Sequence, residues 1–257
     1  MVIIIFFVVH WYISLFFQTF FHHRYASHGA FTMSKAWEKV FYILSFITQG
    51  SSYMSPRAYA VLHRMHHAYT DTDKDPHSPL FFSNIFTMMF HTRKIFSGIY
   101  KRKIVPELRF EKDVPDWPGF DKWTQPWVTK LLWGVVYTVI YVLLAPSAWF
   151  YLLLPFEILM GPVHGAIINW FAHKYGYKNF KLNNTSTNLI PVDVLMLGES
   201  YHNDHHMYPS NANFGVRWFE IDPVYYAILL FNKLGIIELQ GSKASIQTSA
   251  ISKTTVV

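Results

Sequence analysis

The chain contains long uncharged stretches, and the first of them begins at residue 1. Residues 1–21 contain no Asp, Glu, Lys or Arg, and a transmembrane helix needs about 20 apolar residues. The alternative, a cleaved signal peptide, would carry a basic start and a small-residue cleavage site, and this stretch has neither. We therefore predict a retained membrane span that ends at a cluster of histidines.

A second uncharged block predicts two further spans. Between residues 131 and 172 the only formally charged residue is Glu157, and about 40 residues suffice for two crossings. Residues 145–147 read Ala-Pro-Ser, a natural turn between them. Lys and Arg flank the block and are absent from this turn. The positive-inside rule then predicts that the N-terminus lies outside and that the flanks and the C-terminus lie inside.

The segment between these blocks is apolar but interrupted. Residues 36–62 contain a Gln-Gly-Ser-Ser run and Pro56, which favours interfacial helices over another crossing. The predicted fold class is an all-α integral membrane protein with about three transmembrane helices, interfacial helices and a cytoplasmic cap that carries a histidine-rich site. Residues 1–239 would form this single domain. Residues 240–257, which contain no aromatic side chain, are predicted to be a disordered tail.

Composition supports a membrane protein and excludes thiol chemistry. The chain is 51% hydrophobic and 15% charged, whereas soluble domains carry about 25% charged residues. It has no cysteine, which excludes disulfides, thiolate metal sites and a cysteine nucleophile. The net charge of +6 indicates a membrane-surface or acidic-partner preference. The chain has no nucleic-acid-binding motif, so nucleic acid is not an expected partner.

The candidate chemistry lies in three histidine motifs. Two have the spacing H-x-x-H-H and one has H-x-x-x-x-H. Helix positions i, i+3 and i+4 share one face, so each triplet should project together, whereas a spacing of five favours a helix end or a turn. Eight imidazoles exceed the four ligands of a zinc site and suit two metals. The residues are His23 and His28; His63, His66 and His67; and His202, His205 and His206.

Other polar residues lie close to these motifs. Asn169 and His173 are four apart at the inner end of the last predicted span, which would add a ninth histidine. Glu199, one turn before His202, could orient a ligand imidazole or be an ordinary exposed glutamate. Asp71, Asp73 and Asp75 follow the second motif in a turn-rich loop, where they are either solvated or hydrogen-bonded to its histidines.

Within the spans, polar side chains are expected to have structural roles. We predict that His10 and Gln18 bond to backbone or neighbouring helices, and that Glu157 and His164 form a polar pair too deep to reach the histidine motifs. His22 is adjacent to His23 but would point elsewhere on the helix.

Nitrogen ligands without thiolate suit iron, copper, zinc or nickel. A zinc hydrolase would need half as many ligands, whereas two redox-active irons would serve O2 activation. The natural substrate at a membrane is an alkyl chain, and its inert C–H bonds require an oxidant that side chains lack.

The three motifs resemble the histidine boxes of the membrane fatty-acyl desaturases. The motifs are His23-Arg-Tyr-Ala-Ser-His28, His63-Arg-Met-His-His67 and His202-Asn-Asp-His-His206. They are most similar to the stearoyl-CoA Δ9-desaturase branch, whose additional Asn/His pair matches Asn169 and His173. The resemblance implies two irons bound by all nine histidines, with Asn169 acting through water. It also implies O2 as co-substrate, an electron donor of cytochrome b5 or ferredoxin type, and Δ9 desaturation of a saturated fatty acyl chain to give a cis double bond.

The chain departs from that branch in two respects. It has room for three spans where eukaryotic members have four. Val61-Leu62 stands where animal acyl-CoA members carry Arg-Asp, so CoA, acyl carrier protein and a whole lipid all remain open as acyl carriers. The short form implies a bacterial cytoplasmic membrane, with the active site facing the cytoplasm.

A basic run that includes Arg93 and Lys94 is expected on the same side as the histidine motifs. These two residues could hold an anionic acyl carrier, or they could merely touch anionic lipid. The alternative function is a diiron membrane hydroxylase that acts on alkanes or carotenoids. A metal transporter would need polar groups along its spans, and these spans have few.

Overall fold

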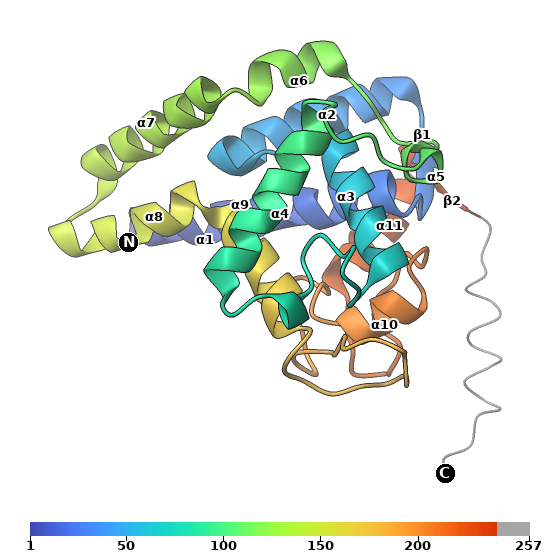
Figure 1. Ribbon diagram of the computed structural model, residues 1–257. Helices are drawn as coiled ribbons and strands as arrows, with labels where there is room; N and C mark the ends of the chain where they lie inside the picture. Colours follow the sequence, from blue (N-terminus) through green and yellow to red (C-terminus); the bar gives the residue numbers. More distant parts are fainter. Residues whose placement is uncertain (241–257) are drawn as a thin grey trace.

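The computed structural model describes residues 1–240 and is mostly helical, with long loops and two short strands (Figure 1). The predicted tail lies, from residue 241 onward, outside the described residues. Two helical runs in the described part are long and apolar enough to cross a membrane. The first consists of α1 (Val2–Phe17) and the π-helix η1 (Gln18–Ser27), and the second is α7 (Trp127–Leu144). The chain turns after α7 where the sequence predicts.

The third predicted span is a broken helix pair. Residues 148–158 and 160–171 pass the same test together but are bent by 68°. Pro162 has no N–H for the carbonyl of Ile158, four residues earlier. The hydroxyl of Ser51 donates to that carbonyl instead, at 2.7 Å. The segments are η4 (Ala148–Leu153), α8 (Leu154–Ile158), α9 (Met160–Ala166) and the π-helix η5 (Ile167–Phe171).

The segment between the first two histidine motifs forms two helices joined by a reversal, and neither helix is among the candidate spans of the described residues. Helix α2 (Lys35–Gln49) packs beside α1, and the chain reverses at η2 (Gly50–Ser52) into α3 (Pro56–Tyr69). Gly50 has φ +53°, and a Cβ there would collide with the Tyr137 hydroxyl of α7. A glycine therefore permits both the turn and the close approach.

Polar side chains fasten these helices together inside the apolar layer. His10 Nδ1 lies 2.5 Å from the fully buried Glu157 carboxylate, and Nε2 donates to the Thr48 carbonyl at 2.7 Å. Gln18 bonds to Gln49. The predictions for His10 and Gln18 are therefore confirmed, but the predicted pairing of Glu157 with His164 is wrong.

His164 instead packs its buried ring edge-on against Trp11, with centroids 4.3 Å apart. Its ring nitrogens have no partner among the described residues. Glu157 is fully buried beside His10 from another helix, a contact between residues 147 positions apart that no local spacing reveals.

The remaining elements build a cap at one end of the long helices (Figure 1). The start of α3 lies beside the end of α4, since Arg57 donates to the Ile99 carbonyl. The C-terminal end of the described chain pairs with the segment that follows η1 through two short antiparallel strands, in which Phe31 pairs with Leu239. These elements are β1 (Phe31–Met33), η3 (Pro79–Phe81), α4 (Ile85–Tyr100), α5 (Leu108–Glu111), α6 (Pro118–Thr124), α10 (His202–Met207), α11 (Pro223–Lys233) and β2 (Ile237–Leu239).

Candidate metal centre

The structure gathers all nine histidines singled out in the sequence into two compact groups. In each group the ligand nitrogens lie within 4.8 Å of one another. The five-histidine group contains His23, His28, His63, His67 and His205, and the four-histidine group contains His66, His173, His202 and His206.

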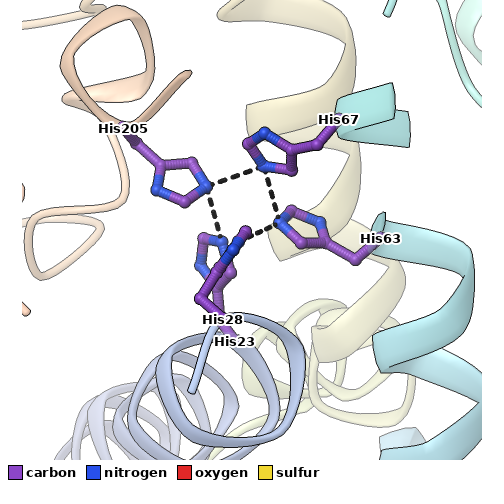
Figure 2. A group of neighbouring side chains, drawn as sticks. All are labelled: His23, His28, His63, His67 and His205. Atoms are coloured by element: carbon purple, nitrogen blue, oxygen red, sulfur yellow. Dashed lines mark hydrogen bonds between the residues drawn. The ribbon is translucent and has the colours of Figure 1, made fainter. Parts of the chain in front are cut away.

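In the five-histidine group every ring directs Nε2 towards a common centre (Figure 2). The Nε2 atom of His205 lies 3.0 Å from that of His23 and 2.9 Å from that of His67. His63 Nε2 lies 3.0 Å from His67 and 2.8 Å from His28. The rings come from η1, α3 and α10, so three elements far apart in sequence meet here.

The four-histidine group shows the same convergence. His202 Nε2 lies 3.0 Å from the Nε2 atoms of both His173 and His206. His206 Nε2 lies 3.2 Å from His66 Nε2. His173 follows η5, so the C-terminal end of the broken span contributes one ring to this group.

A π-helix explains the spacing of the first motif. The backbone N–H of His28 bonds to the carbonyl of His23 at 3.2 Å, the i to i−5 bond that defines a π-helix. One such turn returns the chain to the same face after five residues. The prediction of a helix end holds for His28, which is the C-cap of η1, but not for His23, which lies within the π-helix.

The H-x-x-H-H spacing distributes each triplet over both groups. On α3, His63 and His67 join the five-histidine group and His66 the four-histidine group. On α10, His205 joins the first and its neighbour His206 the second. Each short helix therefore contributes to two adjacent sites, which explains why both motifs carry a histidine doublet.

Buried carboxylates fix two of the rings. Asp75 accepts from His66 Nδ1 at 2.9 Å, and Glu199 accepts from His23 Nδ1 at 2.7 Å. Thr19 donates to the second Glu199 oxygen. Placing the proton on Nδ1 leaves the Nε2 lone pair of each ring facing its group. Glu199 is therefore buried and bonds to an imidazole. Of the two roles that the sequence allowed, the structure supports the carboxylate that orients an imidazole and not the exposed glutamate. The imidazole is that of His23.

His173 is oriented through a hydroxyl. Its Nδ1 donates to Thr185 Oγ1 at 3.1 Å, and Thr185 donates in turn to Asp71 at 2.8 Å. Of the three loop carboxylates, Asp71 and Asp75 therefore hydrogen-bond at the centre, whereas Asp73 is exposed.

The environment keeps these imidazoles neutral. Burial lowers the pKa of His63 and His205 well below the usual value, and neighbouring histidines lower it further. The same causes lower the pKa of His202 and His206. Several neutral rings that present lone pairs to one point repel one another unless a cation lies between them, so both groups have the chemistry of metal sites.

Three of the candidate residues from the sequence lie outside the histidine motifs, one on η5 and two on α4. Asn169 is half-buried on η5, and its side chain makes no hydrogen bond within residues 1–240. Arg93 and Lys94 are exposed on α4. These three positions are not drawn into either histidine group.

Two other histidines adjoin the centre. The buried His77 was missed; its ring centroid lies 4.2 Å from that of His66, and it forms a third cluster with His66 and Asp75. The sequence feature that could have identified His77 is its position two residues after Asp75, in the polar loop that follows the second histidine motif. His22 points away from both groups and bonds to the Met54 carbonyl at 2.9 Å.

Comparison with known proteins agrees with this geometry. The sequence model of the fatty acid desaturase family matches residues 1–232. The chain belongs to the fatty acid desaturase family. It is 31% identical to the Delta-9 desaturase-like 5 protein of Arabidopsis thaliana over 85% of this chain and 70% of that protein. It is also 31% identical to the sn-1 stearoyl-lipid 9-desaturase of Synechocystis sp., over 83% of this chain and 64% of that protein. A protein of the same description from Anabaena variabilis is 27% identical, over 83% of this chain and 74% of that protein.

Membership settles the reaction class. This desaturase is a membrane enzyme that acts on a fatty acyl substrate and requires an electron donor. The relatives do not favour the hydroxylase alternative. The helical fold with its apolar helices and histidine clusters confirms the fold class expected from the sequence.

Proposed function

We propose that this desaturase introduces a cis Δ9 double bond into a saturated fatty acyl chain, using O2 and two electrons at two irons. The observation that carries the proposal is the convergence of nine Nε2 atoms on two adjacent points. Each point would hold one iron, with Asn169 contributing to the second through a water.

The donor set suits two redox-active irons. Nine nitrogen ligands without a thiolate exceed the four of a zinc site. Bound iron would supply the O2-derived oxidizing power that abstraction of hydrogen from an unactivated methylene requires.

The protein's own groups would hold and shield this chemistry. Glu199 and Asp75 fix the tautomers of His23 and His66, so both rings present Nε2 without rearrangement. Most rings of the two groups are buried, which keeps bulk water from the reacting chain. The buried Phe214 covers His205, with ring centroids 4.4 Å apart.

Relatives support the position of the double bond and suggest a carrier. The names of the similar Arabidopsis, Synechocystis and Anabaena proteins all specify the Δ9 position. Two of them act on lipid-bound stearoyl chains by name, and the Arg-Asp pair of animal acyl-CoA enzymes is absent here. We propose that the exposed Arg93 and Lys94 contact the anionic group of the carrier.

The electrons would come from a donor of cytochrome b5 or ferredoxin type. The protein would reside in a bacterial cytoplasmic membrane with both histidine groups facing the cytoplasm, because Lys and Arg are concentrated on that side of the predicted spans.

Expression in a host that lacks Δ9 activity tests the reaction. Gas chromatography of total fatty acids should show a new cis-Δ9 product, and the His205→Ala variant should show none. A hydroxylated product, or no change with the wild-type chain inserted and loaded with metal, would contradict the proposal.

Metal analysis tests the cofactor separately. Purified protein should contain about two irons per chain. A single metal, or stoichiometric zinc after growth in iron-rich medium, would exclude the diiron assignment.

A further inference from the structure

One part of the cap surface is strongly apolar and bare. Phe86 and Phe90 on α4 are 72% and 68% exposed, and Leu80 and Phe81 on the preceding η3 are 57% and 53% exposed. Phe86 and Phe90 are four residues apart and so share one side of the helix. We call these four residues the η3–α4 face. Bare clusters of large apolar side chains mark interaction sites or membrane contacts.

Two cations follow the aromatic residues on the same helix. Arg93 and Lys94 lie about one turn beyond Phe90, are exposed, and form no ion pair within residues 1–240. Aromatic side chains followed by Lys and Arg with long flexible stems characterise helices that lie at the boundary of headgroups and acyl chains. Anionic phospholipid headgroups complement this charge.

The opposite side of α4 faces the interior of the enzyme. Met88 is fully buried, and the end of the Met89 side chain lies 3.8 Å from the Cβ position of Gly165 on α9. The Thr92 hydroxyl donates at 3.2 Å to the carbonyl of Pro76, next to the buried His77. Helix α4 therefore contacts both the broken span and the loop beside the four-histidine group.

Helix α4 packs against a candidate membrane span. Helix α9 belongs to a helix pair that is apolar enough to cross a membrane, and α4 packs directly on it. One side of α4 packs on this span and the other side exposes aromatic side chains. The bilayer around the span is therefore close enough to cover the exposed side.

We propose that the η3–α4 face is immersed in the bilayer surface and that the acyl chain enters along α4 from a membrane lipid, not from a water-soluble carrier. This inference rests on the proposed desaturase function. A soluble acidic carrier would satisfy Arg93 and Lys94 but would leave Phe86 and Phe90 in water or cover them with polar surface. An anionic lipid satisfies both kinds of side chain at once.

The absence of cysteine permits a direct test of immersion. Phe86→Cys and Phe90→Cys each provide a single site for a nitroxide label, and Lys181→Cys, on an exposed loop of the cap, provides the control. In nanodiscs that contain phosphatidylglycerol, labels at 86 and 90 should collide with O2 and be shielded from a water-soluble nickel chelate. The label at 181 should show the reverse. Labels at 86 and 90 that are as accessible to nickel as the control would overturn the inference.

Substrate competition tests the carrier. Wild-type enzyme in nanodiscs, with an electron donor, should desaturate acyl chains esterified to phospholipid in preference to the same chain as a CoA or acyl-carrier-protein thioester. The double variant Phe86→Ser/Phe90→Ser should lose rate on the lipid severalfold while keeping its metal content. Trp149→Ser, which removes an exposed aromatic residue from the broken span, should not.

The two failures can be told apart. Product from thioesters alone would overturn the inference and leave the desaturase function intact. Product from neither carrier, in metal-loaded enzyme, would count against the proposed function, and the spin labels would still decide whether the face is immersed.

Discussion

The two histidine groups share helices α3 and α10 but differ in their third element and in their number of rings. The five-histidine group takes rings from η1, α3 and α10, whereas the four-histidine group takes them from α3, α10 and the end of the broken span. Octahedral coordination involves about six ligands, so one imidazole fewer leaves more room for water, O2 or substrate. Helix α4 also contacts the loop beside the four-histidine group, through the bond from Thr92 to the Pro76 carbonyl. We infer that the two metals would be unequal, the second being the more open.

Loss of a ring should have the largest effect and should separate the groups. His205→Ala and His28→Ala remove ligands from the five-histidine group, and His206→Ala and His66→Ala from the four-histidine group. Each should abolish unsaturated product while leaving membrane insertion intact, and metal content should fall from about two towards one. Gas chromatography measures the unsaturated product, and metal analysis measures the number of metals per chain. Activity losses of twofold or less would show that these rings are not ligands, because even their hydrogen-bond partners typically contribute about 10–100-fold.

Removing a carboxylate partner should have the next largest effect. Glu199→Gln acts on His23 and Asp75→Asn on His66, and each amide can still accept a hydrogen bond but carries no charge. Turnover or metal affinity should fall by about 10–100-fold, with the affected metal in the five-histidine group for Glu199 and in the four-histidine group for Asp75.

A matched control uses the exposed carboxylate of the same loop. Asp73→Asn should leave turnover and metal affinity unchanged, because Asp73 touches neither group. Equal losses in Asp73→Asn and Asp75→Asn would assign the effect to loop charge and not to the hydrogen bond with His66.

The contents of the two groups could be predicted from the sequence, but not their partition. The repeated H-x-x-H-H spacing identifies His66 and His67 because it is a local property of helix faces. Which group each ring joins depends on how α3 and α10 pack against each other, and no local pattern contains that information. Glu199 shows the same limit, since it lies three residues before His202 but bonds to His23, 176 positions away.

Part of the fold could likewise be predicted from the sequence, and part could not. Charge depletion predicts α1 and α7, and the Pro162 that breaks the last span is visible in the sequence. The partner of the freed Ile158 carbonyl, Ser51, is supplied by tertiary packing. The π-helix at His23 was not expected, because a spacing of five matches an α-helix face poorly and only the observed backbone bonds reveal the wider turn.

Acidification should release the metal of the four-histidine group first. Burial lowers the pKa of His173, but the carboxylates of Asp71 and Asp75 oppose this shift. At His63 and His205 burial and neighbouring histidines all act to lower the pKa. His173 should therefore gain a proton at a higher pH than these rings, and protonation competes with metal binding.

The two single-metal variants allow this order to be measured. His205→Ala should retain the metal of the four-histidine group, and His206→Ala that of the five-histidine group. The pH at which half the metal is lost should be higher for His205→Ala than for His206→Ala. The opposite order of these two pH values would contradict the assignment.

Metal-free protein should lose stability as the pH falls below the usual histidine pKa of about 6.5, because the unfolded chain then binds protons that the buried neutral rings do not.

Asn169 should show the smallest effect and tests the open side of the four-histidine group. It lies four residues before His173, about one helical turn away, and its half-buried amide has no hydrogen-bond partner within residues 1–240. If it holds a water on the second metal, Asn169→Ala should lower kcat by up to about 10-fold with little change in KM, and both metals should remain bound. His173→Ala, one turn away, should lose a metal and all activity. Unchanged kcat in Asn169→Ala would remove Asn169 from the centre, and loss of a metal would make it a direct ligand and the two groups more alike than the structure indicates.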